Sequence, residues 1–172
     1  MKRAVFLDRD GVLNKAIIRN GVAVSPRTRD EFCLVEDAPY AVQALKEVGF
    51  NVIVVTNQPD IARGHLSQED LNWMTEQIRT VIAIDEVLIC PHDDYHGCDC
   101  RKPKAGMLTE GARQWNIDLS QSFMIGDSWK DIEAGNTAGC TCILINAVYN
   151  KDVQCRHRVR TLSEAIEIIL GR

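Results

Sequence analysis

The sequence predicts an α/β fold in which a mainly parallel sheet lies between helices on both of its faces. Strand-like segments alternate with helical segments of about 10–15 residues along the chain, as they do in βαβ units. Residues 51–56 are a run rich in β-branched side chains, which is typical of a strand buried on both faces of a parallel sheet. The 172 residues are enough for one domain, which we expect to span 1–172.

The first third of the chain holds two strands and a helix. Residues 4–8 are apolar and predict the first strand, whereas the polar stretch 15–31 predicts a long loop or a small hairpin. A helix is indicated by apolar residues at helical spacing, namely Ala38, Ala41, Val42, Leu45 and Val48. Gly49 is expected to end this helix before the buried strand 51–56.

The middle of the chain continues the alternation. Ser67, with Asp70 three residues later, matches a capping box and begins a helix that extends to about Ile82. Residues 85–90 are the next predicted strand. A helix over about 105–115 follows a loop rich in cysteine and histidine.

The last third adds two strands and two helices. Residues 122–126 and 141–145 are the strands, and a helix begins near Trp129 between them. Ser163 is expected to cap the final helix. The apolar side of that helix holds Ile166, Ile169 and Leu170. In residues 155–160 arginines alternate with other side chains, which we interpret as the solvated face of a late strand or loop rather than a phosphate-binding patch.

Composition and charge indicate a cytoplasmic protein that does not bind nucleic acid. Hydrophobic residues make up 45% and charged residues 26%, and no apolar run approaches the ~20 residues that span a bilayer. The N-terminus lacks the apolar length of a signal peptide. A net charge of −4 argues against general nucleic-acid binding. We expect a monomer without a membrane partner.

Polar side chains gather at strand ends, beginning with Asp8 and Asp10. Alternate side chains of a strand share a face, so both aspartates point the same way, and Gly11 lets the chain turn sharply after them. Open α/β sheets bind ligands at this carboxyl edge, and two carboxylates this close favour a cation or a shared proton between them. A solvated turn is the alternative interpretation of these residues alone.

Three further strand ends carry similar groups. Thr56 and Asn57 follow the buried strand, and residues 101–104 form a basic group before a helix. Asp127 and Asp131 lie four residues apart on one helical face. Each group alone is also explained by a turn or a solvated loop. Because the carboxyl ends of parallel strands meet at one edge, together they predict acids, a hydroxyl, an amide and a lysine in one site.

The cysteine loop (residues 90–101) predicts a metal site of a different kind. The seven cysteines of a cytoplasmic chain are expected to be reduced, so their clustering indicates metal rather than disulfides. The candidate ligands in this loop are Cys90, His92, Cys98 and Cys100. Such a Cys₃His set suits tetrahedral zinc, and a site filled by protein ligands is structural. His96 is either a competing ligand or a solvated side chain.

With these residues the chain resembles the haloacid dehalogenase (HAD) superfamily. The matching positions are Asp8 to Gly11, Thr56-Asn57, Lys102, and Gly126-Asp127 with Asp131. The runs Phe-Leu-Asp-Arg-Asp-Gly, Val-Val-Thr-Asn-Gln and Cys-Asp-Cys-Arg-Lys-Pro further resemble the D,D-heptose 1,7-bisphosphate phosphatases, and the related histidinol-phosphate phosphatases share much of this set. The resemblance implies a three-layer Rossmann-like domain and a Mg²⁺-dependent phosphatase that passes through an aspartyl-phosphate.

The resemblance also implies a role for each matching side chain. Asp8 would be the nucleophile, and Asp10 the acid that protonates the departing sugar oxygen and then the base that activates water. Thr56 and Lys102 would bind the transferring phosphoryl oxygens.

Two ions are implied as well. Magnesium would be held by the carboxylates of Asp8 and Asp127 and the backbone carbonyl of Asp10, while Asp131 would orient Lys102 or a metal-bound water. A structural zinc on the four ligands of the cysteine loop would fix the segment that carries Arg101 and Lys102.

The rim of the site is expected to be open. No insertion of the size of a cap domain fits between the motifs, so loops 15–31, 57–65 and 90–101 would form the rim. The side chains expected to contact the substrate are Asn57, Gln58, Arg101, Arg19 and Ser128. Arg101 would hold a second phosphate or a hydroxyl in its guanidinium fork, and Arg19 is a sugar or phosphate contact or a solvated arginine.

The leading hypothesis is therefore a phosphatase that acts on a heptose bisphosphate in precursor synthesis for lipopolysaccharide or another surface polysaccharide. Two departures from those phosphatases bear on the substrate and not on the reaction. Residues 15–21 lack acidic and aromatic side chains, and Pro59-Asp60 replaces Ser-Gly. The alternatives are a histidinol-phosphate phosphatase, a nucleic-acid 3′-phosphatase, and a zinc-stapled binding module with a vestigial site.

Overall fold

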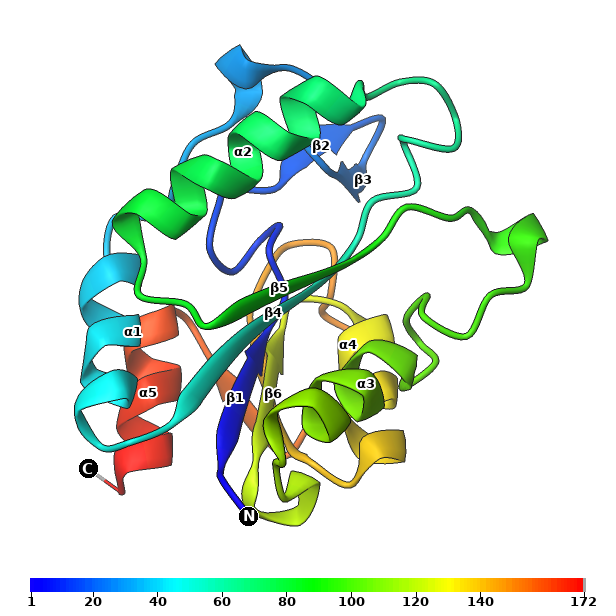
Figure 1. Ribbon diagram of the computed structural model, residues 1–172. Helices are drawn as coiled ribbons and strands as arrows, with labels where there is room; N and C mark the ends of the chain where they lie inside the picture. The colour runs from blue at the N-terminus through cyan, green and yellow to red at the C-terminus, as the bar shows by residue number, and fades with distance from the viewer. Residues whose placement is uncertain (172) are drawn as a thin grey trace.

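The computed structural model describes residues 1–171 of the protein. Within them, six parallel strands form a central sheet. Helices lie on both faces of this sheet (Figure 1). Across the sheet the strands are β5 (Glu86–Cys90), β4 (Asn51–Asn57), β1 (Ala4–Leu7), β6 (Phe123–Gly126), β7 (Thr141–Ile145) and β8 (His157–Val159). The predicted three-layer α/β architecture is confirmed.

Strand β1 lies inside the sheet, between β4 and β6, and it packs against both helical layers. Its side chains alternate between the faces: Val5 and Leu7 belong to one hydrophobic core, Ala4 and Phe6 to the other. The backbone N–H of Asp8 donates to the Ile125 carbonyl of β6 at 2.9 Å, which continues the ladder one residue past the strand. Asp8 therefore leaves the sheet at its carboxyl edge from a position held on two sides.

Four helices pack on the sheet in two pairs. Helices α1 (Ala38–Glu47) and α5 (Leu162–Leu170) cover one face, and α3 (Gly106–Trp115) and α4 (Trp129–Ala138) cover the other. Helix α2 (Gln68–Val81) lies near the carboxyl edge, where its first half forms a small separate cluster with Leu66.

Most of the predicted helix signals are correct, and two are corrected. Ser67 caps α2 as predicted, because its Oγ accepts the Asp70 N–H at 3.0 Å. The cap of α5 is Thr161 rather than Ser163: Thr161 Oγ1 accepts the Glu164 N–H at 3.1 Å. Val48 was expected on the apolar side of α1, but α1 ends at Glu47 and the Val48 side chain is exposed.

The short segments complete the carboxyl edge. The stretch 15–31 contains the predicted hairpin, formed by β2 (Ile17–Arg19) and β3 (Val22–Val24) around a turn at Asn20-Gly21 in which both residues have positive φ. The 3₁₀ turns are Arg29–Glu31, Asp94–His96 and Leu119–Gln121. Between β1 and β4 the described chain holds only the hairpin, the Arg29–Glu31 turn and α1 as regular elements, so this interval contains no inserted cap domain. In residues 1–171, no helix has the length and hydropathy that crossing a membrane requires.

Candidate active site

The carboxyl ends of the central strands open into a pocket of about 440 Å³. The side chains that line it include Asp8, Asp10, Asn57, Lys102, Asp127 and Asp131. These residues lie at or beyond the carboxyl ends of β1, β4, β5 and β6, so the fold produces the predicted convergence of acids, an amide and a lysine at one edge. The hydroxyl that was predicted with them, that of Thr56, is fully buried and does not line the pocket.

Lys102 is the electrostatic centre of the pocket. Its Nζ donates to Asp8 Oδ1 at 2.8 Å, to Asp131 Oδ1 at 2.6 Å and to the Val55 carbonyl at 2.8 Å, so all three ammonium protons are used. Burial lowers the pKa of Lys102, but Asp131 and Asp8 outweigh it and the net shift is upward. Burial raises the pKa of Asp8 to about 7 in spite of the ammonium. The ammonium is therefore a permanent charge beside Asp8.

Asp8 and Asp127 offer free carboxylate oxygens for a cation. One carboxylate oxygen from each of Asp8, Asp127 and Asp131 lies within 4.8 Å of the other two. Both oxygens of Asp131 are taken, because Oδ1 accepts from Lys102 and Oδ2 accepts from Ser128 Oγ at 2.6 Å. Among residues 1–171, Asp8 Oδ2 and Asp127 Oδ1 accept no hydrogen bond. Burial, and after it the nearby charge of Asp8, raises the pKa of Asp127 well above its ordinary value. Clustered carboxylate oxygens of this kind fit a hard cation such as Mg²⁺.

Asp10 is held by a dense set of donors. Its Oδ1 accepts from Arg9 Nε at 3.0 Å and from Asn14 Nδ2 at 2.9 Å. Its Oδ2 accepts from Ser25 Oγ at 2.7 Å and from Gln58 Nε2 at 2.8 Å. Burial raises the pKa of Asp10, but Arg9 and these hydrogen bonds reverse the shift and lower it. Asp10 is thus an ionised, fixed carboxylate in the ligand-free pocket.

The polar side chains at the end of β4 form hydrogen bonds mainly with neighbouring protein groups. Asn57 and Lys102 form a reciprocal pair: Asn57 Nδ2 donates to the Lys102 carbonyl at 2.9 Å, and the Lys102 N–H donates to Asn57 Oδ1 at 3.0 Å. Thr56 is fully buried, and its Oγ1 accepts from Gln58 Nε2 at 2.9 Å. Gln58 therefore links the Thr56 hydroxyl to the Asp10 carboxylate.

The cysteine loop brings its four candidate ligands together. The Sγ atoms of Cys90, Cys98 and Cys100 lie 2.9 to 3.6 Å apart. His92 Nδ1 lies 3.7 Å from Cys90 Sγ and 3.5 Å from Cys100 Sγ. Ligands of a tetrahedral zinc are separated by roughly 3.5–3.8 Å, so this donor set fits zinc. His96 is not in the cluster: its Nδ1 accepts the Asp93 N–H and its ring stacks on Tyr95.

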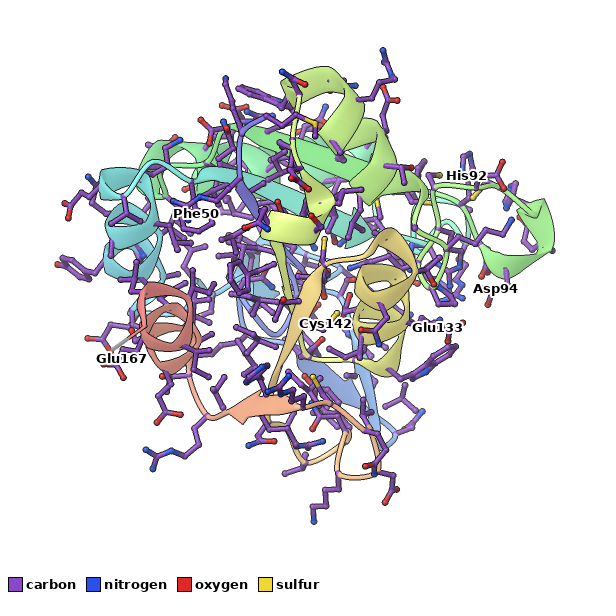
Figure 2. All side chains as sticks on the ribbon, turned by 90° about the horizontal axis from the view of Figure 1, so that it is seen from below. Phe50, His92, Asp94, Glu133, Cys142 and Glu167 are labelled. Atoms are coloured by element: carbon purple, nitrogen blue, oxygen red, sulfur yellow. The ribbon has the colours of Figure 1, made fainter. Side chains whose placement is uncertain are left out.

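The same loop presents Arg101 to the pocket. Arg101 Nε donates to Asp94 Oδ1 at 2.7 Å, and Nη1 donates to the His92 carbonyl at 3.2 Å. Figure 2 shows His92 and Asp94 together at the side of the molecule opposite Glu167 of α5. Two cations that the motifs did not indicate, Arg63 and Lys130, line the pocket as well.

Lys130 differs from the two arginines in having no counter-ion. Arg63 is paired with Asp93 at 2.6 Å, and Arg101 with Asp94, whereas no carboxylate oxygen of residues 1–171 lies within 4.0 Å of Lys130 Nζ. Burial, together with Arg101, lowers the pKa of Lys130. The three side chains form a basic wall (Arg63, Arg101 and Lys130) that has room for a further negative charge.

Three expectations about individual residues change. Gln58 is fully buried and is not among the residues that line the pocket, so its expected contact with substrate is replaced by hydrogen bonds to Asp10 and Thr56. Arg19 is not among the residues that line the pocket, and its expected contact with substrate is replaced by an ion pair with Glu31 that joins the hairpin to the following 3₁₀ turn. Tyr149 was not singled out, yet it lines the pocket and donates a hydrogen bond to Asp127 Oδ2. It lies four residues past β7, so the rule that strand ends carry the site could have found it.

Comparison with known proteins agrees with this geometry. Residues 99–159 match the family model described as HAD-hydrolase-like. The chain is 38% identical over 150 residues to the D-glycero-beta-D-manno-heptose-1,7-bisphosphate 7-phosphatase of Haemophilus ducreyi, which covers 80% of this chain and 79% of the relative. The protein of the same name from Pasteurella multocida is 40% identical over 149 residues, covering 80% and 78%.

A solved structure shares the whole fold. The D,D-heptose 1,7-bisphosphate phosphatase from B. bronchiseptica, crystallised with magnesium and phosphate, superposes with a TM-score of 0.86 at 28% identity and covers 99% of both chains. The likeness therefore extends through every strand that carries a site residue. The chain belongs to the family of HAD-like hydrolases that these relatives represent.

Proposed function

We propose that this protein, acting as one domain over residues 1–172, is a magnesium-dependent phosphatase that removes the C7 phosphate of D-glycero-β-D-manno-heptose 1,7-bisphosphate. The product would serve the synthesis of heptose precursors for lipopolysaccharide or another surface polysaccharide. The observation that carries the proposal is the position of Asp8, which leaves the sheet between β4 and β6 with Oδ1 bonded to Lys102 and with one carboxylate oxygen within 4.8 Å of an Asp127 oxygen. The names of the relatives support a heptose bisphosphate as the substrate.

The residues divide the reaction into two steps. In the first, an Asp8 carboxylate oxygen attacks phosphorus, the bond from phosphorus to the sugar oxygen breaks, and the sugar oxygen takes a proton from Asp10. In the second, water attacks phosphorus and gives a proton to Asp10, the bond from phosphorus to the Asp8 oxygen breaks, and inorganic phosphate leaves as the Asp8 carboxylate is restored. Because its donors keep the pKa of Asp10 low in the ligand-free pocket, Asp10 gains its proton when the negative charge of the substrate arrives.

The remaining polar groups stabilise charge. Lys102 would bind the transferring phosphoryl oxygens, and Asp131 keeps Lys102 in place. The Thr56 hydroxyl, which is buried behind Gln58 in the ligand-free pocket, would join Lys102 in binding them. The carboxylates of Asp8 and Asp127 and the carbonyl of Asp10 would hold magnesium, which when bound offsets the repulsion between Asp8 and the phosphate.

Zinc on the cysteine loop would have a structural role and no catalytic one. Cys90, His92, Cys98 and Cys100 would fill its coordination sphere and leave no position for substrate. The loop that it closes carries Arg101, whose Nη1 donates to the backbone carbonyl of the ligand His92. The ion would therefore set the position of one part of the basic wall.

The basic wall supports a substrate with a second, retained phosphate. Arg63 and Arg101 are oriented by aspartates, whereas Lys130 has a desolvated charge and no partner among the described residues. A phosphate that accepts from Lys130 and Arg101 would supply the missing anion, and a guanidinium binds such a group in a fork. A sugar monophosphate would leave the Lys130 ammonium without an anionic partner.

The proposal is tested with a panel of phosphate esters. Phosphate release is measured in the presence of Mg²⁺ from both anomers of the heptose bisphosphate, from histidinol phosphate and from a heptose monophosphate. The expected kcat/KM for the β-anomer of the bisphosphate exceeds the values for histidinol phosphate and the monophosphate by roughly 100-fold.

Asp8→Asn should abolish turnover, and Asp30→Asn, at an exposed carboxylate outside the pocket, is the matched control. Full turnover by Asp8→Asn would overturn the nucleophile, and a preference for histidinol phosphate would overturn the substrate.

A further inference from the structure

Tyr149 makes a contact that the proposed chemistry does not use. Its hydroxyl donates to Asp127 Oδ2, and the side chain lines the active-site pocket. The partner atom is one of the two oxygens of a carboxylate that would hold magnesium, and the other oxygen, Oδ1, accepts no hydrogen bond among residues 1–171. The tyrosine thus occupies one side of Asp127 and leaves the other side available.

The turn that carries Tyr149 is pinned to the sheet. Asn150 is buried, and its Nδ2 donates to the Asp127 carbonyl at 2.7 Å and to the Ile145 carbonyl at 2.8 Å. Its Oδ1 accepts the Ala147 N–H at 3.0 Å, which closes the turn on itself. The ends of β6 and β7 therefore fix the backbone next to Tyr149, and the hydroxyl reaches Asp127 from a rigid support.

Gly11 leaves the space in which this contact forms. A Cβ at Gly11 would lie 1.9 Å from Asp127 Oδ2 and 3.1 Å from Tyr149 Oη, and the residue has φ of +86°. Both the open volume and the backbone conformation favour glycine here. The backbone after Asp10, the Asp127 carboxylate and the Tyr149 hydroxyl thus meet at one point.

We infer that Tyr149 is a positioning residue for the metal site: by occupying Asp127 Oδ2 it holds the carboxylate so that Oδ1 faces the cation beside Asp8. This inference rests on the proposed function, because it assumes that Asp8 and Asp127 hold magnesium. Donors to ligand carboxylates orient them, and their loss weakens metal binding by about 10- to 100-fold in other proteins.

Cation size separates positioning from simple packing. Mg²⁺ requires near-ideal octahedral geometry, whereas Ca²⁺ accepts variable geometry and bidentate carboxylates. If the hydroxyl fixes the direction of Asp127, its removal should weaken Mg²⁺ binding much more than Ca²⁺ binding. If Tyr149 only fills space, Phe at this position should leave both affinities unchanged.

The test uses Tyr149→Phe in the full chain, with zinc retained, and Tyr40→Phe on the exposed face of α1 as the matched control. Calorimetry without substrate measures the Kd for Mg²⁺ and for Ca²⁺, and the rise in Tm with each cation gives a second reading. We expect the Kd for Mg²⁺ to rise about 10-fold in Tyr149→Phe and the Kd for Ca²⁺ to rise less than about 3-fold. Both values stay unchanged in Tyr40→Phe.

Three outcomes overturn the inference. Wild-type Mg²⁺ affinity in Tyr149→Phe removes the role of the hydroxyl. Equal losses for the two cations show a general disturbance of the pocket rather than control of direction. Absence of Mg²⁺ binding by the wild-type chain removes the metal site itself, and because the wild type is measured first, this failure of the proposed function is distinguished from failure of the tyrosine.

Discussion

Replacing Lys102 by methionine should produce a destabilisation that depends strongly on pH. Methionine keeps the apolar stem and removes the ammonium from between Asp8 and Asp131, at 2.8 and 2.6 Å. The exposed fractions of the Lys102 and Asp131 side chains are 2% and 1%, so water cannot replace the lost partner. Removing one member of a buried ion pair costs about 3–5 kcal/mol.

The free energy needed to protonate a buried carboxyl group sets an upper limit to this loss of stability. The folded variant can take up a proton on a buried carboxyl, which requires about 1.4 kcal/mol for each pH unit above the ordinary aspartate pKa of about 3.9. The limit is therefore about 5 kcal/mol at pH 7.5 and about 2 kcal/mol at pH 5.5 for one carboxyl. The sign follows because the folded variant binds one proton more than the folded wild type, whose Asp8 already has a pKa raised to about 7, while the unfolded chains bind protons alike. The loss of stability relative to wild type therefore shrinks as the pH falls.

Urea unfolding at the two pH values, in buffer without magnesium, measures the difference from wild type. At pH 7.5 we also expect Tm to fall by about 6 to 20 °C. Lys104→Met is the matched control, because that side chain is 51% exposed and its loss should change stability by less than about 1 kcal/mol. A loss below 1 kcal/mol for Lys102→Met, or the same loss at both pH values, would refute the electrostatic account.

Three further substitutions test other parts of the molecule. Cys98→Ser should lower the zinc content measured by mass spectrometry from one ion per chain toward none, with a lower Tm; an unchanged metal content would contradict a structural ion on the cysteine loop. Gly135→Ala should destabilise the protein by about 1–3 kcal/mol in urea, because the new Cβ would lie 2.5 Å from Cys142 Sγ and 2.8 Å from Met124 Cβ. Figure 2 shows Cys142 on the sheet beside α4, and Cys142→Ala in the same chain should recover part of the loss, whereas no loss in Gly135→Ala would show that α4 shifts freely. Lys130→Met should raise KM for the heptose bisphosphate about 10-fold and change kcat/KM for a heptose monophosphate less than about 2-fold, and equal effects on the two substrates would remove the retained phosphate from the basic wall.

Most of the strands were predictable from the sequence because most of their side chains are apolar and at least partly buried. β1, β4, β6 and β7 lie within one residue of their predicted ranges, since an apolar or β-branched run between polar ends is required wherever both faces are covered. β8 has three residues and a mixed pattern, and only its pairing with β7 makes it a strand. The α5 cap was misplaced because Thr161 and Ser163 are both good cap residues, and the hydrogen bond from Ser163 to Asp37 of a distant segment decides between them.

The site residues divide in the same way, into those that a local sequence pattern predicts and those that depend on contacts between distant segments. Asp8 and Asp127 directly follow strands and Asp10 lies three residues past β1, so all three are predicted by the placement of ligand-binding residues at the carboxyl ends of parallel strands. The contact of Tyr149 with Asp127 depends on a turn whose geometry is set by hydrogen bonds to two strand ends. The basic wall likewise depends on which loops come together, and Lys130 gains its significance from the absence of a carboxylate near it among the described residues.

The sheet order has a consequence for how much mutational change the pocket can tolerate. Asp8 emerges between β4 and β6, while the rim of the pocket is built largely from the hairpin, residues 57–65 and the cysteine loop. Substitutions in the hairpin, or in the cysteine loop outside its four candidate metal ligands, leave the ladder around the nucleophile untouched. We expect new substrate preferences to be obtainable by laboratory selection from libraries confined to the rim, with the rate of phosphoryl transfer inherited from the central strands.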